Sequence, residues 1–126
     1  MIDHMSIGVR DIDRARRFYD AVLQPLGYRC LSRSDGSLGY GDKSAAFWIL
    51  SVKKPVAPDS DSGFHICFAA PARASVDSFH AAALKAGGVD NGGPGLRRDY
   101  GPDYYAAFVV DPEGYRLEAY CGRTET

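Results

Sequence analysis

The sequence predicts an α+β fold built from two consecutive β-α-β-β-β modules. Aligning residues 2–28 with residues 63–89, without a gap, places His4 on His65 and Phe18 on Phe79. Both segments begin with an apolar run that carries one histidine, and both continue into an amphipathic helix that ends at glycine. A supersecondary pattern repeated at a constant offset indicates a duplicated module. If the modules pack about a pseudo-two-fold axis, the two histidines can meet near that axis.

Length and composition are typical of one small domain, which we expect to span residues 1–126. The chain has 15 basic and 16 acidic residues, a formal net charge of −1, and these charges are scattered, so nothing favours nucleic acid or a charged membrane surface as a partner. No apolar run approaches the roughly 18 residues of a membrane span. Three cysteines without C-x-x-C spacing favour free thiols and a cytoplasmic location.

The first module is expected to occupy about residues 1–53. Its first strand, Ile2–Val9, alternates so that His4 faces away from Met5, Ile7 and Val9. Asp11 can cap the following helix, which ends near Pro25 and Gly27. Three short strands complete the module, at about Tyr28–Ser32, Ser37–Tyr40 and Ala45–Val52.

Residues 54–63, rich in proline, serine and acidic side chains, are expected to link the halves, and the second module is expected at about 64–122. Its strand restarts at Phe64. The next helix is expected near Ala74–Ala86, with its apolar face in register with the first. Gly87 to Gly95 contains five glycines and should be a mobile loop. The last strands, about Tyr104–Val110 and Tyr115–Gly122, flank a tight turn at Asp111-Pro112-Glu113-Gly114.

A carboxylate in the middle of the last strand is the third candidate for a shared site. Period two puts Glu118 on the face opposite Leu117 and Ala119. Two neutral imidazoles and one carboxylate bind a divalent transition metal and leave coordination positions open. Structural zinc sites close their fourth position, so an open site is of the catalytic kind. We therefore expect His4, His65 and Glu118 to be metal ligands, with Glu118 also the candidate catalytic carboxylate.

These residues together resemble the vicinal oxygen chelate superfamily. The resemblance rests on the doubled module, on Ile2-Asp3-His4, on His65, and on Asp111-Pro112-x-Gly114-x-x-x-Glu118, and it covers nearly the whole chain. It implies a curved sheet around a central cleft, one divalent ion (Zn, Mn, Ni or Fe), a small-molecule substrate that chelates the ion through adjacent oxygens, and a homodimer that often completes the cleft.

Three branches of the superfamily differ in how closely this chain resembles them. Glyoxalase I has a glutamate where this chain has Trp48, so a strict lactoylglutathione lyase is not expected, and Trp48 would wall the cleft. Extradiol dioxygenases place a tyrosine where this chain has Phe108, which makes ring cleavage the less favoured chemistry. Fosfomycin thiol transferases resemble the end of the chain more closely. Ser6, Tyr105, Tyr120 and Arg97 are the further candidates for substrate binding.

Two functions remain open on the sequence. The ligand triplet favours a metal-dependent lyase, isomerase or transferase acting on a small oxygenated metabolite. The missing fourth ligand and the aromatic residues near the expected cleft favour a metal-free binding protein of the bleomycin-resistance type instead.

Overall fold

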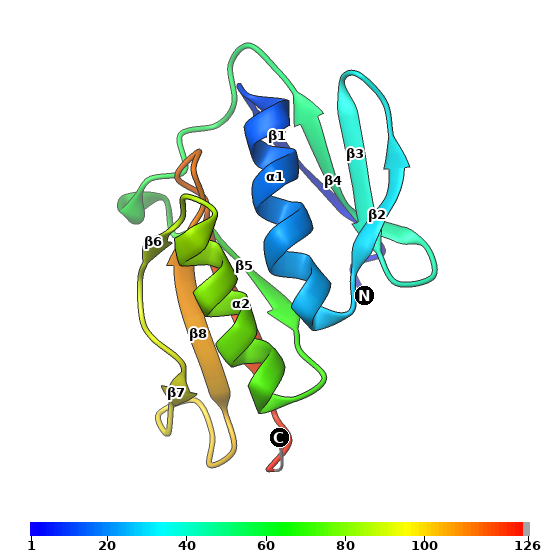
Figure 1. The fold of residues 1–126 in the computed structure, drawn as a ribbon. Coiled ribbons are helices and arrows are strands. Elements are labelled where there is room, and N and C mark those ends of the chain that lie inside the picture. The colour runs from blue at the N-terminus through cyan, green and yellow to red at the C-terminus, as the bar shows by residue number, and fades with distance from the viewer. Residues whose placement is uncertain (125–126) are drawn as a thin grey trace.

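The chain folds into two sheets, one from each half, with two neighbouring helices in front of them (Figure 1). The structure is a computed structural model, and it describes residues 1–124. The first half contributes β1 (Met5–Val9), β2 (Arg29–Arg33), β3 (Ser37–Gly41) and β4 (Ala45–Ser51), with α1 (Ile12–Leu23) and a short 3₁₀ helix at Gln24–Leu26. The predicted β-α-β-β-β order of the first half is confirmed.

The second half repeats this order with two additional short strands. It contains β5 (His65–Ala69), α2 (Arg73–Lys85), β6 (Val89–Asp90), β7 (Gly95–Leu96), β8 (Tyr105–Val110) and β9 (Arg116–Cys121), and a 3₁₀ turn at Ser60–Ser62 precedes it. The glycine-rich segment was expected to contain no element, and this is wrong in part. β6 and β7 lie at its ends because both pair antiparallel with β8.

The two sheets share one strand arrangement, which supports the duplication inferred from the sequence. In the first sheet the order is β1-β4-β3-β2, and in the second it is β5-β9-β8-β6. In each sheet the first strand is an edge strand that pairs parallel with the last strand of its half. Ser6 pairs with Trp48, and Cys67 pairs with Glu118. Trp48 and Glu118 therefore occupy equivalent positions, as predicted from the sequence.

The core lies between the helices and the sheets. Asp11 caps α1 by accepting a hydrogen bond from the Arg14 amide. The apolar stripe that helical spacing predicts on α1 is buried except for its first residue, which is partly buried: Ile12, Ala15, Phe18, Tyr19 and Val22. The fully buried aromatic rings that the helices contribute are Phe18 and Tyr19 on α1 and Phe79 on α2, and the strands and turns add Tyr40 and Tyr115. Burying one such ring contributes about 1.5–3 kcal/mol, so these rings help to hold the helices on the sheets.

The first strand is shorter than predicted. Its ladder begins where Met5 pairs with Phe47, so Ile2, Asp3 and His4 lie outside the sheet, and all three are exposed. The alternation in the sequence indicates which face each residue would take, but it does not indicate where the pairing with β4 begins, and β4 itself continues to Ala45.

The Asp111–Gly114 turn joins the second half to the start of α1. The side chain of Glu113 is 5% exposed, and its Oε2 accepts hydrogen bonds from the Arg10 and Asp11 amides and from Arg14 Nη2. The two amides belong to the turn between β1 and α1. A single carboxylate therefore holds one end of the first module against the second.

Glu113→Ala is expected to lower the free energy of unfolding by about 2 kcal/mol, because it leaves two backbone donors without their acceptor. Chemical denaturation measures the change. Asp13→Ala is the matched control, since Asp13 is an exposed carboxylate in the first turn of the same helix. Equal losses in the two variants would show that Glu113 does not join the modules.

Candidate functional site

Glu118 is a buried carboxylate on the face of the second sheet opposite the helices. Its neighbours in β9, Leu117 and Ala119, belong to the hydrophobic core on the helix side. Glu118 points to the other face and is nevertheless only 2% exposed. β9 lies between β5 and β8, so Glu118 has Cys67 beside it on one strand and Phe108 on the other. Burying a carboxylate is costly unless it is hydrogen-bonded, which makes its partners informative.

Each carboxylate oxygen of Glu118 has one side-chain partner. His65 begins β5, and its Nε2 lies 3.1 Å from Glu118 Oε1. Tyr104 lies directly before β8, and its hydroxyl donates to Oε2 at 2.5 Å. The His65 side chain is 53% exposed, so this pair is accessible from solvent. The second module alone thus brings two of the three predicted ligands into contact.

An open cleft of about 600 Å³ lies over this pair. His65 and Glu118 line it together with Tyr100, Tyr104 and Phe108. The Tyr104 ring stacks on Tyr120 at 4.1 Å between centroids, and Tyr100 meets it edge-on at 5.1 Å. The cleft therefore combines one imidazole and one carboxylate with aromatic walls, and its size suits a small organic molecule.

The groups around Glu118 keep their protons. Burial, and then the nearby Glu118 charge, raises the pKa of the Cys67 thiol to about 12. Burial and the hydrogen bond to Glu118 also raise the pKa of Tyr104 well above its ordinary value. Cys67 is therefore a poor nucleophile at neutral pH, and Tyr104 remains a hydrogen-bond donor.

His4, the third predicted ligand, is not gathered with the other two. Its Nδ1 lies 2.7 Å from Asp3 Oδ1, and its side chain is 59% exposed. Within residues 1–124, no three histidine, cysteine, aspartate or glutamate side chains are placed to hold one metal ion. The expectation that one chain assembles the complete triplet is thus corrected: His65 and Glu118 meet because their strands are neighbours, whereas His4 precedes β1 in the other sheet.

Ser6 and Trp48 lie side by side in the first sheet, away from the His65 cleft. They pair across β1 and β4, and the Trp48 ring covers Gly39 on β3, where an added Cβ would come within 2.7 Å of it. Ser6 lines a separate hollow with Phe64 and Tyr115. Neither residue lines the cleft over His65 and Glu118 in this chain.

The second-module candidates divide between the two faces of the sheet. The Tyr105 hydroxyl donates to Asp77 of α2 at 2.6 Å, so Tyr105 lies on the helix side; this corrects its predicted place in the cleft. Tyr120 stacks on Tyr104, which lines the cleft, but Tyr120 itself is not a lining residue. The Arg97 guanidinium lies over the ring of Phe108, 5.3 Å from its centroid, and Phe108 lines the cleft whereas Arg97 does not.

Tyr104 is the functional candidate that sequence reasoning passed over in favour of Tyr105. The strand pairing shows why, because Phe108 faces Glu118 across β8 and β9. Period two then places residues 104, 106 and 108 on one face and Tyr105, Ala107 and Val109 on the other. Ala107 and Val109 are both buried, and their apolar side chains are the sequence signal that assigns Tyr105 to the core side.

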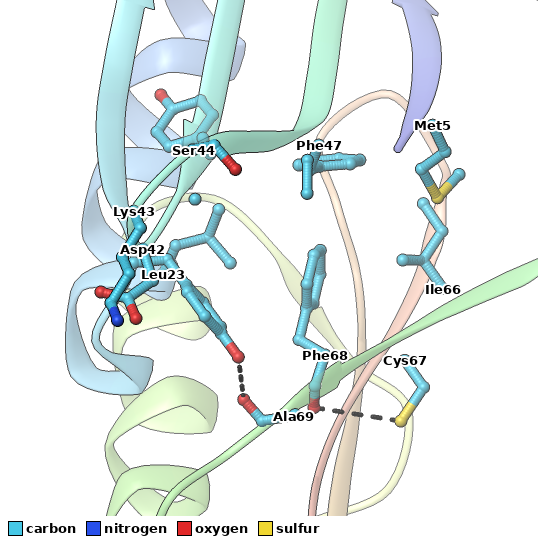
Figure 2. Close-up of a pocket in the computed structure, with 14 residues that line it drawn as sticks. Met5, Leu23, Asp42, Lys43, Ser44, Phe47, Ile66, Cys67, Phe68 and Ala69 are labelled. Carbon is cyan, nitrogen blue, oxygen red and sulfur yellow. Dashed lines mark hydrogen bonds between the residues drawn. The ribbon is translucent and has the colours of Figure 1, made fainter. Parts of the chain in front are cut away.

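A second cavity, of about 440 Å³, lies at the seam between the two halves. Figure 2 shows Phe47 and Phe68 facing one another there, with Met5 beside Ile66; the two rings are 5.3 Å apart between centroids. Side chains of the β3–β4 turn, including Lys43, form its rim. His65 and Glu118 do not line it, so it is distinct from the cleft described above.

Comparison with known proteins identifies the family. The sequence model of one protein family, the Glyoxalase/Bleomycin resistance protein/Dioxygenase superfamily, matches residues 1–119. The chain belongs to this superfamily. A glyoxalase/bleomycin resistance protein from Albidiferax ferrireducens T118 has 28% identity and a TM-score of 0.80, over 94% of this chain and 95% of that one. No curated protein matches the chain.

Two further solved structures share the fold at lower identity. A putative glyoxalase from Bacillus halodurans has 22% identity and a TM-score of 0.71, and 95% of this chain and 94% of that chain are covered. The fosfomycin resistance protein FosX from Mesorhizobium loti has 21% identity and a TM-score of 0.69, with 96% and 91% covered. Among residues 1–124, no helix has the length and apolar character needed to cross a bilayer.

Proposed function

We propose that this protein is a metal-dependent enzyme of lyase, isomerase or thiol-transferase type that acts on a small oxygenated metabolite. The observation that carries the proposal is the contact between His65 Nε2 and Glu118 Oε1, 3.1 Å apart in an open cleft. A neutral imidazole and a carboxylate are suitable ligands for Zn²⁺, Mn²⁺, Ni²⁺ or Fe²⁺. The donor set of the cleft therefore fits two of the ligands that a divalent ion needs.

The third ligand in this proposal is His4 of a second copy of the chain. His4 is the counterpart of His65 in the repeat, and its exposed imidazole is accessible to another molecule. A homodimer would bring such a side chain from outside to the His65–Glu118 pair. This arrangement would leave further coordination positions for two adjacent oxygens of a substrate.

A divalent ion bound there would supply Lewis acidity, polarising a carbonyl or hydroxyl oxygen of the substrate. The protein side chains have separate tasks. Tyr100 and Phe108 would pack against the carbon skeleton of the substrate. Arg116 lines the cleft, and its Nη1 donates to the Pro58 carbonyl at 3.1 Å, which holds a positive charge at the wall. Glu118 is the only carboxylate among the side chains of residues 1–124 that line this cleft.

The aromatic walls favour a second candidate, a metal-free binding protein of the bleomycin-resistance type. Tyr100, Tyr104 and Tyr120 form one connected cluster of rings. Tyr100 and Tyr104 line the cleft together with Phe108. Stacked rings can retain a planar ligand by apolar contact without any chemistry. The same measurement of metal content separates the two candidates.

Protein purified without chelator is expected to contain about one divalent ion per chain by elemental analysis, and His65→Ala is expected to lose it, because an imidazole ligand is removed. His80→Ala is the matched control, since His80 pairs with Asp90 on the helix side. Folded wild-type protein that takes up none of Zn²⁺, Mn²⁺, Ni²⁺ or Fe²⁺ would contradict the enzyme and support the binding protein.

A further inference from the structure

We infer that Tyr104 is a positioning residue that holds the Glu118 carboxylate in the orientation that presents Oε1 beside His65. The inference rests on the proposed function, because its purpose is to prepare a metal ligand. It assigns a role to a side chain outside the expected ligand set. Three observations support it: the bonds at the carboxylate, the packing of the Tyr104 ring, and the construction of the loop that carries it.

The bonds divide the carboxylate between two partners. The Tyr104 hydroxyl donates to Oε2 at 2.5 Å, while His65 Nε2 lies 3.1 Å from Oε1. A carboxylate with one donor on a known oxygen cannot rotate freely about its last torsion without losing that bond. The Tyr104 hydroxyl therefore fixes the orientation of the carboxylate, which leaves the other oxygen directed toward His65 and available for an ion.

The Tyr104 ring is itself held by its neighbours. It stacks on Tyr120 with 29° between the ring planes, and Tyr100 contacts it edge-on. Tyr120 lies two residues after Glu118 on β9 and so shares its face of the sheet. Because these contacts involve the ring alone, removing the hydroxyl leaves the packing intact, and this property makes the inference testable.

The backbone around Tyr104 is also bonded on both sides. The Arg97 amide donates to the Tyr104 carbonyl at 2.7 Å, and the Tyr100 amide donates to the Arg97 carbonyl at 3.0 Å. The Arg97 guanidinium donates to the carbonyls of Gly93 and Gly95 at 2.7 and 3.0 Å. Arg97 thus connects the glycine-rich segment to the loop before β8. These bonds indicate that Arg97 stabilises the loop that carries Tyr104.

A hydrogen-bonded partner behind a metal ligand orients the ligand and adjusts its basicity, and its loss costs about 10- to 100-fold in metal affinity. Tyr104→Phe removes one oxygen atom and keeps the ring. We expect the dissociation constant for Zn²⁺, measured by competition with a chromogenic chelator, to rise by at least about 10-fold. The variant should stay folded because the stack on Tyr120 remains, and its thermal unfolding midpoint should decrease only by the effect of one hydrogen bond lost at a buried carboxylate.

Tyr100→Phe is the matched control. It removes the same atom from the adjoining ring, whose hydroxyl is not a partner of Glu118 in the described part of the chain, so Zn²⁺ affinity should not change. A Tyr104→Phe variant that binds Zn²⁺ as tightly as the wild type would overturn the inference. Equal weakening in both variants would also overturn it, because the effect would then come from aromatic packing.

Crystal structures of wild-type and Tyr104→Phe proteins without metal give a second, independent readout. We expect the Glu118 carboxylate to rotate in the variant and to lose its contact with His65. An unchanged carboxylate would overturn the positioning role. Wild-type protein that binds no metal would contradict the proposed function alone, since the comparison of carboxylate orientation would still decide the role of Tyr104.

Discussion

Asp111→Ala is expected to destabilise the protein by about 3 kcal/mol, because it leaves several buried donors without an acceptor. Asp111 is 4% exposed. Its Oδ1 accepts the amides of Glu113 and Tyr115 at 2.9 and 2.8 Å, and its Oδ2 accepts the hydroxyl of Tyr19. The residue therefore shapes the β8–β9 turn and also attaches α1 to it. Denaturant unfolding followed by circular dichroism measures the loss.

Tyr19→Phe separates the two contributions, because it removes the bond to α1 and keeps the turn. We expect this variant to lose about 1 kcal/mol, well below the loss in Asp111→Ala. Equal losses in the two variants would mean that the turn amides contribute nothing, and a loss under about 1 kcal/mol in Asp111→Ala would contradict the structural role.

The contribution of Asp111 to the stability of the protein should depend on pH in a known direction. Burial raises the pKa of Asp111 in the folded protein, against the lowering effect of its hydrogen bonds. Between the unfolded value, about 3.9, and the raised folded value, the folded state binds more protons. The contribution of Asp111 to stability therefore decreases as the pH rises through this interval. Wild-type stability relative to Asp111→Asn should decrease over the same interval, and a relative increase would contradict it.

Mixing two variants that each fail to bind metal is expected to restore metal binding if His4 comes from a second copy. His4→Ala and His65→Ala should each lose the ion, since each removes one imidazole ligand from both sites of the proposed dimer. In a dimer formed from one chain of each variant, one site carries both substitutions and the other carries neither. After subunit exchange, about one quarter of all sites should therefore bind metal.

Elemental analysis of the mixed and separate samples measures this recovery, and differently tagged chains verify that exchange has occurred. His4→Ala mixed with Glu118→Ala should recover in the same way, whereas His65→Ala mixed with Glu118→Ala should not, because these two ligands lie in one chain 3.1 Å apart. Verified exchange without any recovery would contradict a site shared between copies.

Local sequence signals predicted most of the fold. Asp11 as a helix cap, the buried stripes of both helices, and the turn at Asp111–Gly114 all follow from short-range chemistry, and the structure confirms each of them. The ends of the strands were less well predicted. β1 begins at Met5 and not at Ile2, because the extent of a ladder depends on how closely two strands approach, and the partner β4 lies about forty residues away in the chain.

The candidate site was predicted only in part for the same reason. The repeat indicated His65, and the period of the last strand indicated Glu118, but their contact depends on β5 and β9 being neighbours. Tyr104 became recognisable only through the pairing of Phe108 with Glu118. Tyr105 was misplaced because two adjacent tyrosines have the same chemistry, and only their faces of the sheet distinguish them.

The sequence by itself determined the duplicated order of elements, the buried faces of the helices and the residues with metal-binding chemistry, since each depends on spacing within one segment. Tertiary structure alone decided that Glu118 lies between His65 and Tyr104 and that His4 stands apart from them within residues 1–124. The physical reason is that a hydrogen bond or a ligand set needs atoms within about 3 Å, and strand neighbours far apart in the chain are brought to that distance only by the packing of the whole sheet.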